Sequence, residues 1–244
     1  FVPEDITKTN KLKKPDYADR HKDRNFLVIA NGPSIIEYKN EIKKFIKKYN
    51  PIIIGSNSLG GLFTPDYHVF NNKKLFEKFI DEVSEESMLL VPSSFNSDYV
   101  KSITPMRFEF VQTAKMRQDR FDIIDGVIEN NYQAVAIVSI AISIAMGASQ
   151  VFIAGMDGYK DFETFFQEGL IGQETKKPLI KQQLDISNRS GTFQEQMQWH
   201  NYVERSLRQI NDYLISNDLN DMIIITPTSH KMYYLGISNC LDTG

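Results

Sequence analysis

The residues of this chain that could do chemistry stand directly after its apolar runs. The run Phe26–Ala30 ends in Asn31-Gly32-Pro33-Ser34, and the run 150–155 is followed by Asp157. Amide side chains both donate and accept hydrogen bonds, which suits a nucleobase, a ribose or a sugar hydroxyl. A glycine lets a ligand approach the backbone, and the free N–H groups that begin a helix favour an anion. This loop therefore predicts a nucleotide site with its phosphates held at residues 31–34.

Small polar residues also follow the other apolar runs. Because parallel strands end at one edge of a sheet, we expect these groups to line a single crevice. The loop at 31–34 has neither the glycines of the dinucleotide fingerprint nor the lysine of a Walker A loop, and a plain strand-to-helix turn would look similar. The residues assigned to nucleotide binding are Asn31, Gly32, Pro33, Ser34, Asn57, Asn71, Asp157, Thr228 and Ser229.

Two histidines are the candidates for a catalytic base. Transfer of a group to a hydroxyl needs a base, and imidazole titrates near neutral pH. His230 follows the last apolar run, within TPTSHK, whereas His200 lies inside a helical segment. The sequence has no cluster of closely spaced carboxylates, so it does not predict a metal cage, and no metal ligand is assigned. Asp157 with Asp161 leaves room for one Mg²⁺ bridged to phosphates.

The elements that position these groups alternate between strands and helices. Apolar runs that predict strands occur at 26–30, 52–57, 66–72, 88–92, 107–112, 150–155 and 222–226. Helical spacing is found at 34–49, 73–82, 134–148 and 192–216. Ser34 and Glu37 have the spacing of a capping box, which makes Ser34 the expected N-cap of the first helix. The predicted fold class is α/β, a doubly wound, mostly parallel, Rossmann-like sheet.

The chain is expected to form one nucleotide-binding domain over residues 26–237. Residues 1–25 are polar and show no apolar period, which is typical of an N-terminal arm or linker. Within the domain, residues 157–192 are interpreted as a lid or insertion. Residues 238–244 form a tail.

Composition narrows the class of protein. The 244 residues allow one large α/β domain or two small ones, and a content of 41% hydrophobic and 24% charged residues is ordinary for a soluble globular protein. A net charge of −3 gives no electrostatic reason to expect nucleic acid as a partner. No apolar run is long enough to span a membrane, which leaves only peripheral membrane contact open. The single cysteine, Cys240, excludes a disulfide framework within the chain and favours the reducing cytoplasm.

Two blocks of the sequence resemble known families. VIANGPSI, at 28–35, and IAISIAMGASQVFIAGMDGY, at 140–159, look like the two signatures of the bacterial CMP-sialic acid sialyltransferases. The same blocks resemble the family typified by the archaeal 6-hydroxymethyl-7,8-dihydropterin pyrophosphokinase, whose domain also occurs in motility-associated flagellin glycosyltransferases. The resemblance spans about residues 26–235, and the two blocks are its specific part.

The sialyltransferase resemblance implies roles for particular residues. Asn31 and Ser34 would contact the phosphate and ribose of CMP, and Asn57 and Asn71 would help to hold the nucleotide. Tyr159 is the nearest match to the family's tyrosine after the Gly-x-Asp loop, and it would stabilise the departing phosphate.

The chain departs from the sialyltransferase pattern at the base. That family has its histidine before the last long helix, whereas this chain has none between Asp157 and Trp199. The family's Thr-Ser-Gly before the buried helix is replaced by Ala-Val-Ala at 134–136. His200 and His230 therefore both stay candidates for the base.

The leading prediction is an enzyme, a glycosyltransferase that uses a nucleotide-activated sugar in surface glycan synthesis. A CMP-linked nonulosonic acid is the first choice of donor. A glycan would be the acceptor, no further cofactor would be required, and a homo-oligomer is left open. One alternative is a Mg²⁺-dependent pyrophosphokinase of the 6-hydroxymethylpterin type. Another is a non-catalytic nucleotide- or sugar-binding domain of a larger polypeptide.

Overall fold

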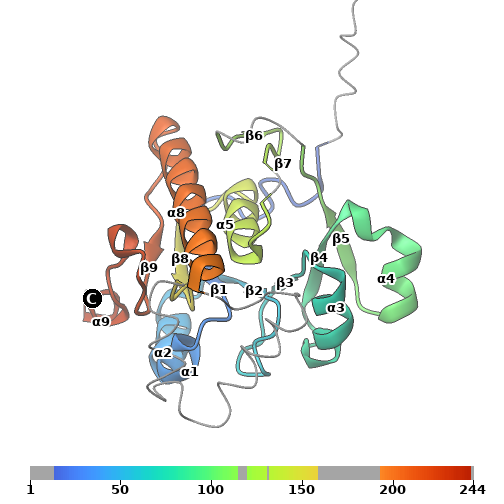
Figure 1. Cartoon of the computed structure of the whole chain (residues 1–244), viewed down its shortest axis with the longest axis horizontal. Coiled ribbons are helices and arrows are strands. Elements are labelled where there is room, and N and C mark those ends of the chain that lie inside the picture. The colour runs from blue at the N-terminus through green and yellow to red at the C-terminus, as the bar shows by residue number, and fades with distance from the viewer. Residues whose placement is uncertain (1–13, 115–119, 131, 159–192, 243–244) are drawn as a thin grey trace, which may run out of the picture.

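The computed structural model describes residues 14–114, 120–130, 132–158 and 193–242. These residues form a seven-stranded parallel sheet with helices on both faces, which confirms the predicted α/β class (Figure 1). The strands lie in the order β5-β4-β3-β2-β1-β8-β9. Their bounds are β1 (Asn25–Ile29), β2 (Ile52–Ser56), β3 (Tyr67–Val69), β4 (Met88–Pro92), β5 (Phe108–Val111), β8 (Gln150–Ala154) and β9 (Ile223–Ile224).

Each segment that showed helical spacing contains at least one helix, and two further helices among the described residues lie outside those segments. The helices are α1 (Ser34–Glu37), α2 (Lys39–Tyr49), α3 (Lys73–Phe79), α4 (Ser97–Ile103), α5 (Val135–Ala145), α8 (Phe193–Ser216) and α9 (Ile237–Asp242). Short 3-10 turns follow as η1 (Ile80–Glu82), η2 (Ser93–Phe95) and η3 (Lys231–Tyr233), and β6 (Ile123–Ile124) pairs with β7 (Val127–Ile128) in a small hairpin. The sequence analysis missed α4, α9 and the hairpin because each is too short to show a period. None of the described helices is long and apolar enough to cross a membrane.

Strand β1 shows why helices cover both faces of the sheet. Phe26 and Val28 belong to the apolar cluster that α5 and α8 complete, whereas Leu27 and Ile29 pack in the cluster of α2 and α9. Successive side chains of a strand point to opposite faces, so an unbroken apolar run is what a doubly covered strand requires.

The sheet has a topological switch point between β1 and β8. From β1 the chain proceeds outward through β2, β3, β4 and β5, and it later returns to β8 on the other side of β1. Ile29 is in register with Ala154, so the loops that follow these two strands leave the sheet side by side. Open α/β sheets bind ligands at such a point, which places the candidate site here.

Residues 14–24 pack against the sheet. Tyr17 is 1% exposed, and its hydroxyl accepts a hydrogen bond from the N–H of Gln112 at 3.1 Å. Arg20 forms an ion pair with Glu109 of β5 at 2.9 Å. A buried ring, an ion pair and backbone hydrogen bonds to the end of α5 hold this segment, and none of these produces a periodic pattern in the sequence.

The first helix begins differently from the prediction. Its N-cap is Pro33, without a side-chain cap hydrogen bond, and the helix is interrupted at Tyr38 into α1 and α2. The capping box of Ser34 and Glu37 does not form, so Ser34 as N-cap is wrong. The reason is tertiary, because Asp157 engages both the N–H and the hydroxyl of Ser34.

Candidate active site

Asp157 ties the loop after β8 to the start of α1. Its carboxylate accepts hydrogen bonds from the Ser34 N–H at 2.8 Å and from the Ser34 hydroxyl at a short distance. The Ser34 hydroxyl also lies 2.9 Å from that of Thr226, which accepts the Gly155 N–H at 2.9 Å. Asp157, Ser34 and Thr226 are all buried. This network joins the carboxyl ends of β1, β8 and β9.

The backbone N–H groups of the loop after β1 are used inside the protein. The Gly32 N–H donates to the carbonyl of Gly155 at 2.8 Å, and the Ser34 N–H donates to Asp157. The next two N–H groups donate to carbonyl groups of the same turn. These N–H groups therefore have internal partners in this structure, and a carboxylate of the protein supplies the negative charge at the start of the helix. Nucleotide binding by residues 31–34 stays a prediction.

Gly32 is required by the contact between these two loops. A Cβ atom added there would lie 2.4 Å from the carbonyl oxygen of Gly155 and 2.7 Å from the Asp157 carboxylate. The backbones of the two loops can therefore approach this closely only without a side chain.

The loop after β9 is joined to the loop after β8. The carbonyl of Asp157 accepts the Ser229 N–H at 2.8 Å and the Ser229 hydroxyl at 3.1 Å. The Thr228 hydroxyl donates to the carbonyl of Met156 at 2.6 Å. These contacts fix the position of His230, whose own N–H donates to the Thr228 hydroxyl at 3.1 Å.

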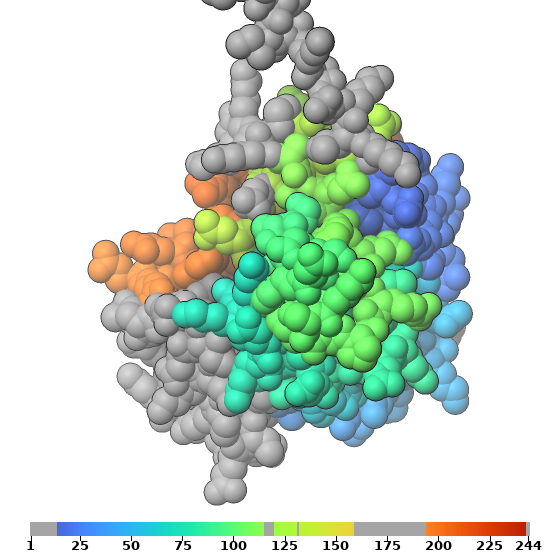
Figure 2. All heavy atoms as spheres, turned by 90° about the vertical axis from the view of Figure 1, so that its right-hand side faces the viewer, coloured from blue at the N-terminus to red at the C-terminus, as the bar shows by residue number. Residues whose placement is uncertain are grey.

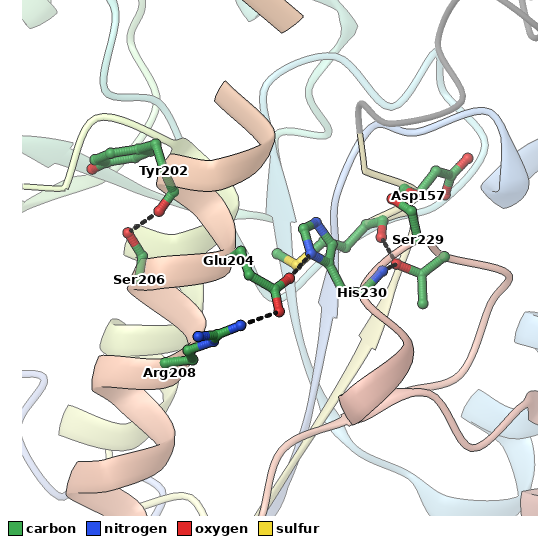
Figure 3. Close-up of polar contacts among 9 residues, drawn as sticks. Asp157, Tyr202, Glu204, Ser206, Arg208, Ser229 and His230 are labelled. Atoms are coloured by element: carbon green, nitrogen blue, oxygen red, sulfur yellow. Dashed lines mark hydrogen bonds and ion pairs between the residues drawn. The ribbon is translucent and has the colours of Figure 1, made fainter. Parts of the chain in front are cut away.

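His230 is buried and oriented by Glu204 of α8. Its Nδ1 lies 2.6 Å from the Glu204 carboxylate (Figure 3). An ionised carboxylate only accepts, so in the neutral ring the proton sits on Nδ1 and Nε2 carries the lone pair. Nε2 has no hydrogen-bond partner among the described residues, and it lies 3.2 Å from where a Cβ of Gly158 would stand. This arrangement is that of a general base held by a carboxylate.

The surroundings of Glu204 keep it ionised. Burial by itself raises the pKa of this carboxyl group. The hydrogen bond to His230 and the charges of His230, Arg208 and His200 lower that pKa, and the net shift is downward. Arg208, one turn along α8, lies 3.6 Å from Glu204 (Figure 3). A carboxylate that stays negative at neutral pH stabilises the imidazolium that forms when His230 takes a proton.

The two predicted bases lie side by side. His200 and His230 stack with their ring centroids 4.6 Å apart and their planes 8° from parallel. His200 is four residues before Glu204, so both project from one face of α8. Glu204 was not among the predicted site residues, although the His-x₃-Glu spacing of His200 and Glu204 on a helix is a signal that the sequence contains.

The structure connects many of the predicted site residues and leaves others apart. Hydrogen bonds, ring stacking and close backbone contacts join one region, made of Gly32, Ser34, Asp157, Thr228, Ser229, His230 and His200. Asn31 and Pro33 lie in the same loop and are half-buried. Tyr159 and most of the predicted lid at 157–192 lie outside the described residues.

The two asparagines after β2 and β3 make contacts close to their own strands. The Asn71 side chain donates to the carbonyl of Gln133 at 2.7 Å, and the backbone carbonyl of Asn57 accepts from the ring of His68. Asn57 has a left-handed backbone, and its buried Oδ1 has no hydrogen-bond partner in the described part of the chain. None of the contacts described for these amides reaches Asp157, so their share in the site stays a prediction.

A comparison with family models identifies the chain's relatives. The model described as 6-hydroxymethylpterin diphosphokinase MptE-like matches residues 4–161. The chain belongs to the MptE-like family. This confirms the resemblance to the pterin pyrophosphokinase type of domain. The match includes the loops after β1 and β8 but ends before His200, Glu204 and His230.

The similarity to solved structures is weaker than the match to the family model. A solved structure, the MAf glycosyltransferase from Magnetospirillum magneticum AMB-1, is similar at 14% sequence identity with a TM-score of 0.39. The similarity covers 56% of this chain and 23% of that one, so the chain spans about a quarter of the structure it matches. No curated protein matches the chain.

Proposed function

We propose that this MptE-like protein is a glycosyltransferase that moves a sugar from a nucleotide-activated donor to a hydroxyl of a glycan. The donor proposed first is a CMP-linked nonulosonic acid. The observation that carries the proposal is the His230–Glu204 pair, a base oriented by a carboxylate, beside the switch point of the sheet.

In this reaction Nε2 of His230 takes the proton of the acceptor hydroxyl. The hydroxyl oxygen attacks the anomeric carbon as the bond from that carbon to the phosphate oxygen breaks, and the nucleotide leaves with both bonding electrons. Glu204 stabilises the positive charge that develops on His230. Tyr159 is proposed, from the family resemblance alone, to assist the departing phosphate.

The donor would lie along the carboxyl edge of the sheet. Strands β2, β1, β8 and β9 are neighbours, and spacings of about 4.8 Å put the ends of β2 and β9 about 14 Å apart. The amides of Asn31 and Asn57 at one end suit the base and ribose, while Ser229 and His230 at the other end suit the sugar and acceptor.

Release of CMP from CMP-N-acetylneuraminic acid, with and without added glycan, tests the proposal. His230→Gln should lower kcat by about 10²–10⁴-fold, because it removes the base. Glu204→Gln should lower it less and change the pH profile, because it removes only the orienting charge. Arg205→Gln is the matched control on the same helix, since Arg205 is exposed and its guanidinium lies over the ring of Tyr202. If His230→Gln turns over like the wild type, His230 is not the base.

Nucleotide binding can be tested separately by thermal shift with CMP, CDP, UDP and ATP, each with and without Mg²⁺. Stabilisation by CMP without metal is expected. Asn31→Ala should weaken CMP by about 1–3 kcal/mol, because a buried ligand group would lose its partner. Unchanged affinity would remove Asn31 from the site, and binding of CMP without turnover of any donor would favour a non-catalytic binding domain.

A second candidate is diphosphoryl transfer from ATP to a pterin alcohol, which the family match over residues 4–161 favours. That reaction would use Mg²⁺, and Asp157 was the carboxylate considered for it. Both Asp157 oxygens accept hydrogen bonds from Ser34, so a metal there would compete with the Ser34 N–H and hydroxyl. This geometry supports glycosyl transfer over diphosphoryl transfer. Formation of AMP from ATP, Mg²⁺ and 6-hydroxymethyl-7,8-dihydropterin would reverse the choice.

A further inference from the structure

His200, Glu204 and His230 together form a set of transition-metal ligands. We propose that these three side chains bind one divalent transition-metal ion, with Zn²⁺ as the ion that fits best. The site lies between α8 and the loop after β9, and the proposal does not depend on the glycosyltransferase assignment.

The spacing of the three side chains suits a single ion. One ligand atom from each residue can be chosen so that all three lie within 4.8 Å of one another. Some point then lies within about 2.8 Å of all three atoms (4.8 Å divided by √3). Zinc bonds to histidine nitrogen and carboxylate oxygen are about 2.0–2.2 Å long, so inward movements of less than about 1 Å complete the coordination.

The chemistry of the set selects the ion. Two imidazoles and one carboxylate are a known combination for Zn²⁺, whereas Mg²⁺ and Ca²⁺ prefer sites made of oxygen atoms. His200 and Glu204 are one helical turn apart on α8, and His230 approaches from another part of the chain. An ion held by all three would therefore link α8 to the loop that follows β9.

Binding changes the proton on His230 and the stacking of the rings. The Nδ1 proton shared with Glu204 would be lost to solvent if Nδ1 ligates, so binding should weaken as the pH falls. The rings are nearly parallel, and nitrogen lone pairs lie in the ring planes, so one ring must turn to face the ion. Glu204 is 23% exposed at its side chain, which leaves the ion a route from water.

Metal binding at this site would affect the reaction, and this consequence rests on the proposed function. A metal-bound His230 is not available as a base, so Zn²⁺ should inhibit sugar transfer. The direct readout is metal binding itself, which needs no donor or acceptor.

The test titrates Co²⁺ into the chelator-treated full chain and follows the visible absorption of cobalt, and then displaces the cobalt with Zn²⁺. One equivalent is expected. His200→Ala and Glu204→Gln should each weaken Co²⁺ by more than about 10-fold, because even outer-shell changes cost 10–100-fold. His21→Ala is the control, since His21 contacts Tyr67 and lies outside the set. His200→Gln replaces His200→Ala if circular dichroism shows misfolding.

Wild-type protein that binds no Co²⁺ or Zn²⁺, or a folded His200 variant that binds like the wild type, would overturn the metal site. The two proposals can fail independently. Metal binding without any release of CMP would overturn the transferase proposal and support the metal site. CMP release that is insensitive to Zn²⁺, in a chain that binds no metal, would support the transferase proposal and overturn the metal site.

Discussion

One end of the sheet is packed with apolar side chains, whereas at the other end buried polar groups connect the strand ends. Around β3, β4 and β5, helices α3 and α4 close an apolar cluster in which Phe76 contacts Phe70, Phe95 and Tyr99. Figure 2 shows this end of the molecule as a continuous rounded surface, in the green colours of this part of the chain. Around β1, β8 and β9, the strand ends are instead connected by the buried polar network of Ser34, Asp157 and Thr226.

Two buried histidines show the same contrast. His68 of β3 stacks on Phe70 and contacts the backbone carbonyl of Asn57, and burial lowers its pKa to about 4. It stays neutral over most of the physiological range. His230 instead has its Nδ1 2.6 Å from the carboxylate of Glu204. One buried histidine is therefore packed between a ring and a backbone carbonyl, whereas the other is oriented by a carboxylate.

The comparison indicates that the apolar cluster around β3, β4 and β5 (the aromatic end) stabilises the fold. The polar network around β1, β8 and β9 (the polar end) positions the side chains that could react. Apolar area is the main stabilising term in folding, whereas a buried polar group contributes little net free energy but is costly to leave unpaired. Substitutions at the two ends should therefore fail in different ways.

The largest effect is expected from Phe76→Ala in the aromatic end. Phe76 is fully buried, so the lost contacts and the cavity should reduce the free energy of unfolding by about 3–5 kcal/mol. Urea denaturation measures this, with Ile215→Ala as the control because Ile215 is 60% exposed. A loss under about 1 kcal/mol would mean that this end is not a packed core.

His68 should make the protein less stable in mild acid. The unfolded state takes up a proton near pH 6.5, whereas folded His68 does so only near pH 4, so stability falls as the pH drops between these values. The contribution is on the order of 3 kcal/mol and is fully present above pH 6.5. His68→Gln should flatten the curve of unfolding free energy against pH in this window. An unchanged slope in that variant would assign the acid sensitivity to other groups.

Gly32→Ala should distinguish the cost of a clash between two loops from the cost of backbone strain at a glycine. The added Cβ meets the backbone of Gly155, and the cost should be about 3 kcal/mol. Gly61→Ala is the matched control, because Gly61 has a φ of +66° but, apart from its chain neighbours, no atom of the described residues lies within 4 Å of an added Cβ. It should cost about 1 kcal/mol. Equal losses in thermal and urea unfolding would show that the loops after β1 and β8 are not in close contact.

Asp157→Asn should give the smallest of these effects on stability. The variant keeps the shape of the side chain but weakens the hydrogen bonds from Ser34, at about 1.5–3 kcal/mol. Asp98→Asn, in the first turn of α4 and exposed, should change the free energy of unfolding by less than about 0.5 kcal/mol. The polar network would be unimportant if the two variants unfold alike.

Most of the fold was predictable because strands buried on both faces are written as unbroken apolar runs. The segment 88–92 was predicted as a strand with the bounds that β4 has. The short elements were missed, since two to seven residues carry too little periodicity. The buried Tyr17 was missed because a single ring shows no period. Ser34 was assigned to a local cap because the sequence shows Glu37 three residues later and cannot show Asp157, which is 123 residues away in the chain.

The sequence by itself determined which residues end each strand, and therefore that polar groups collect at the carboxyl edge of a parallel sheet. Only the tertiary structure decided what those groups do there. The order of the strands places β8 beside β1, which brings Asp157 to Ser34, and the packing of α8 brings Glu204 to His230. Hydrogen bonds and proton affinities depend on distances of a few ångströms, and the folded chain sets those distances.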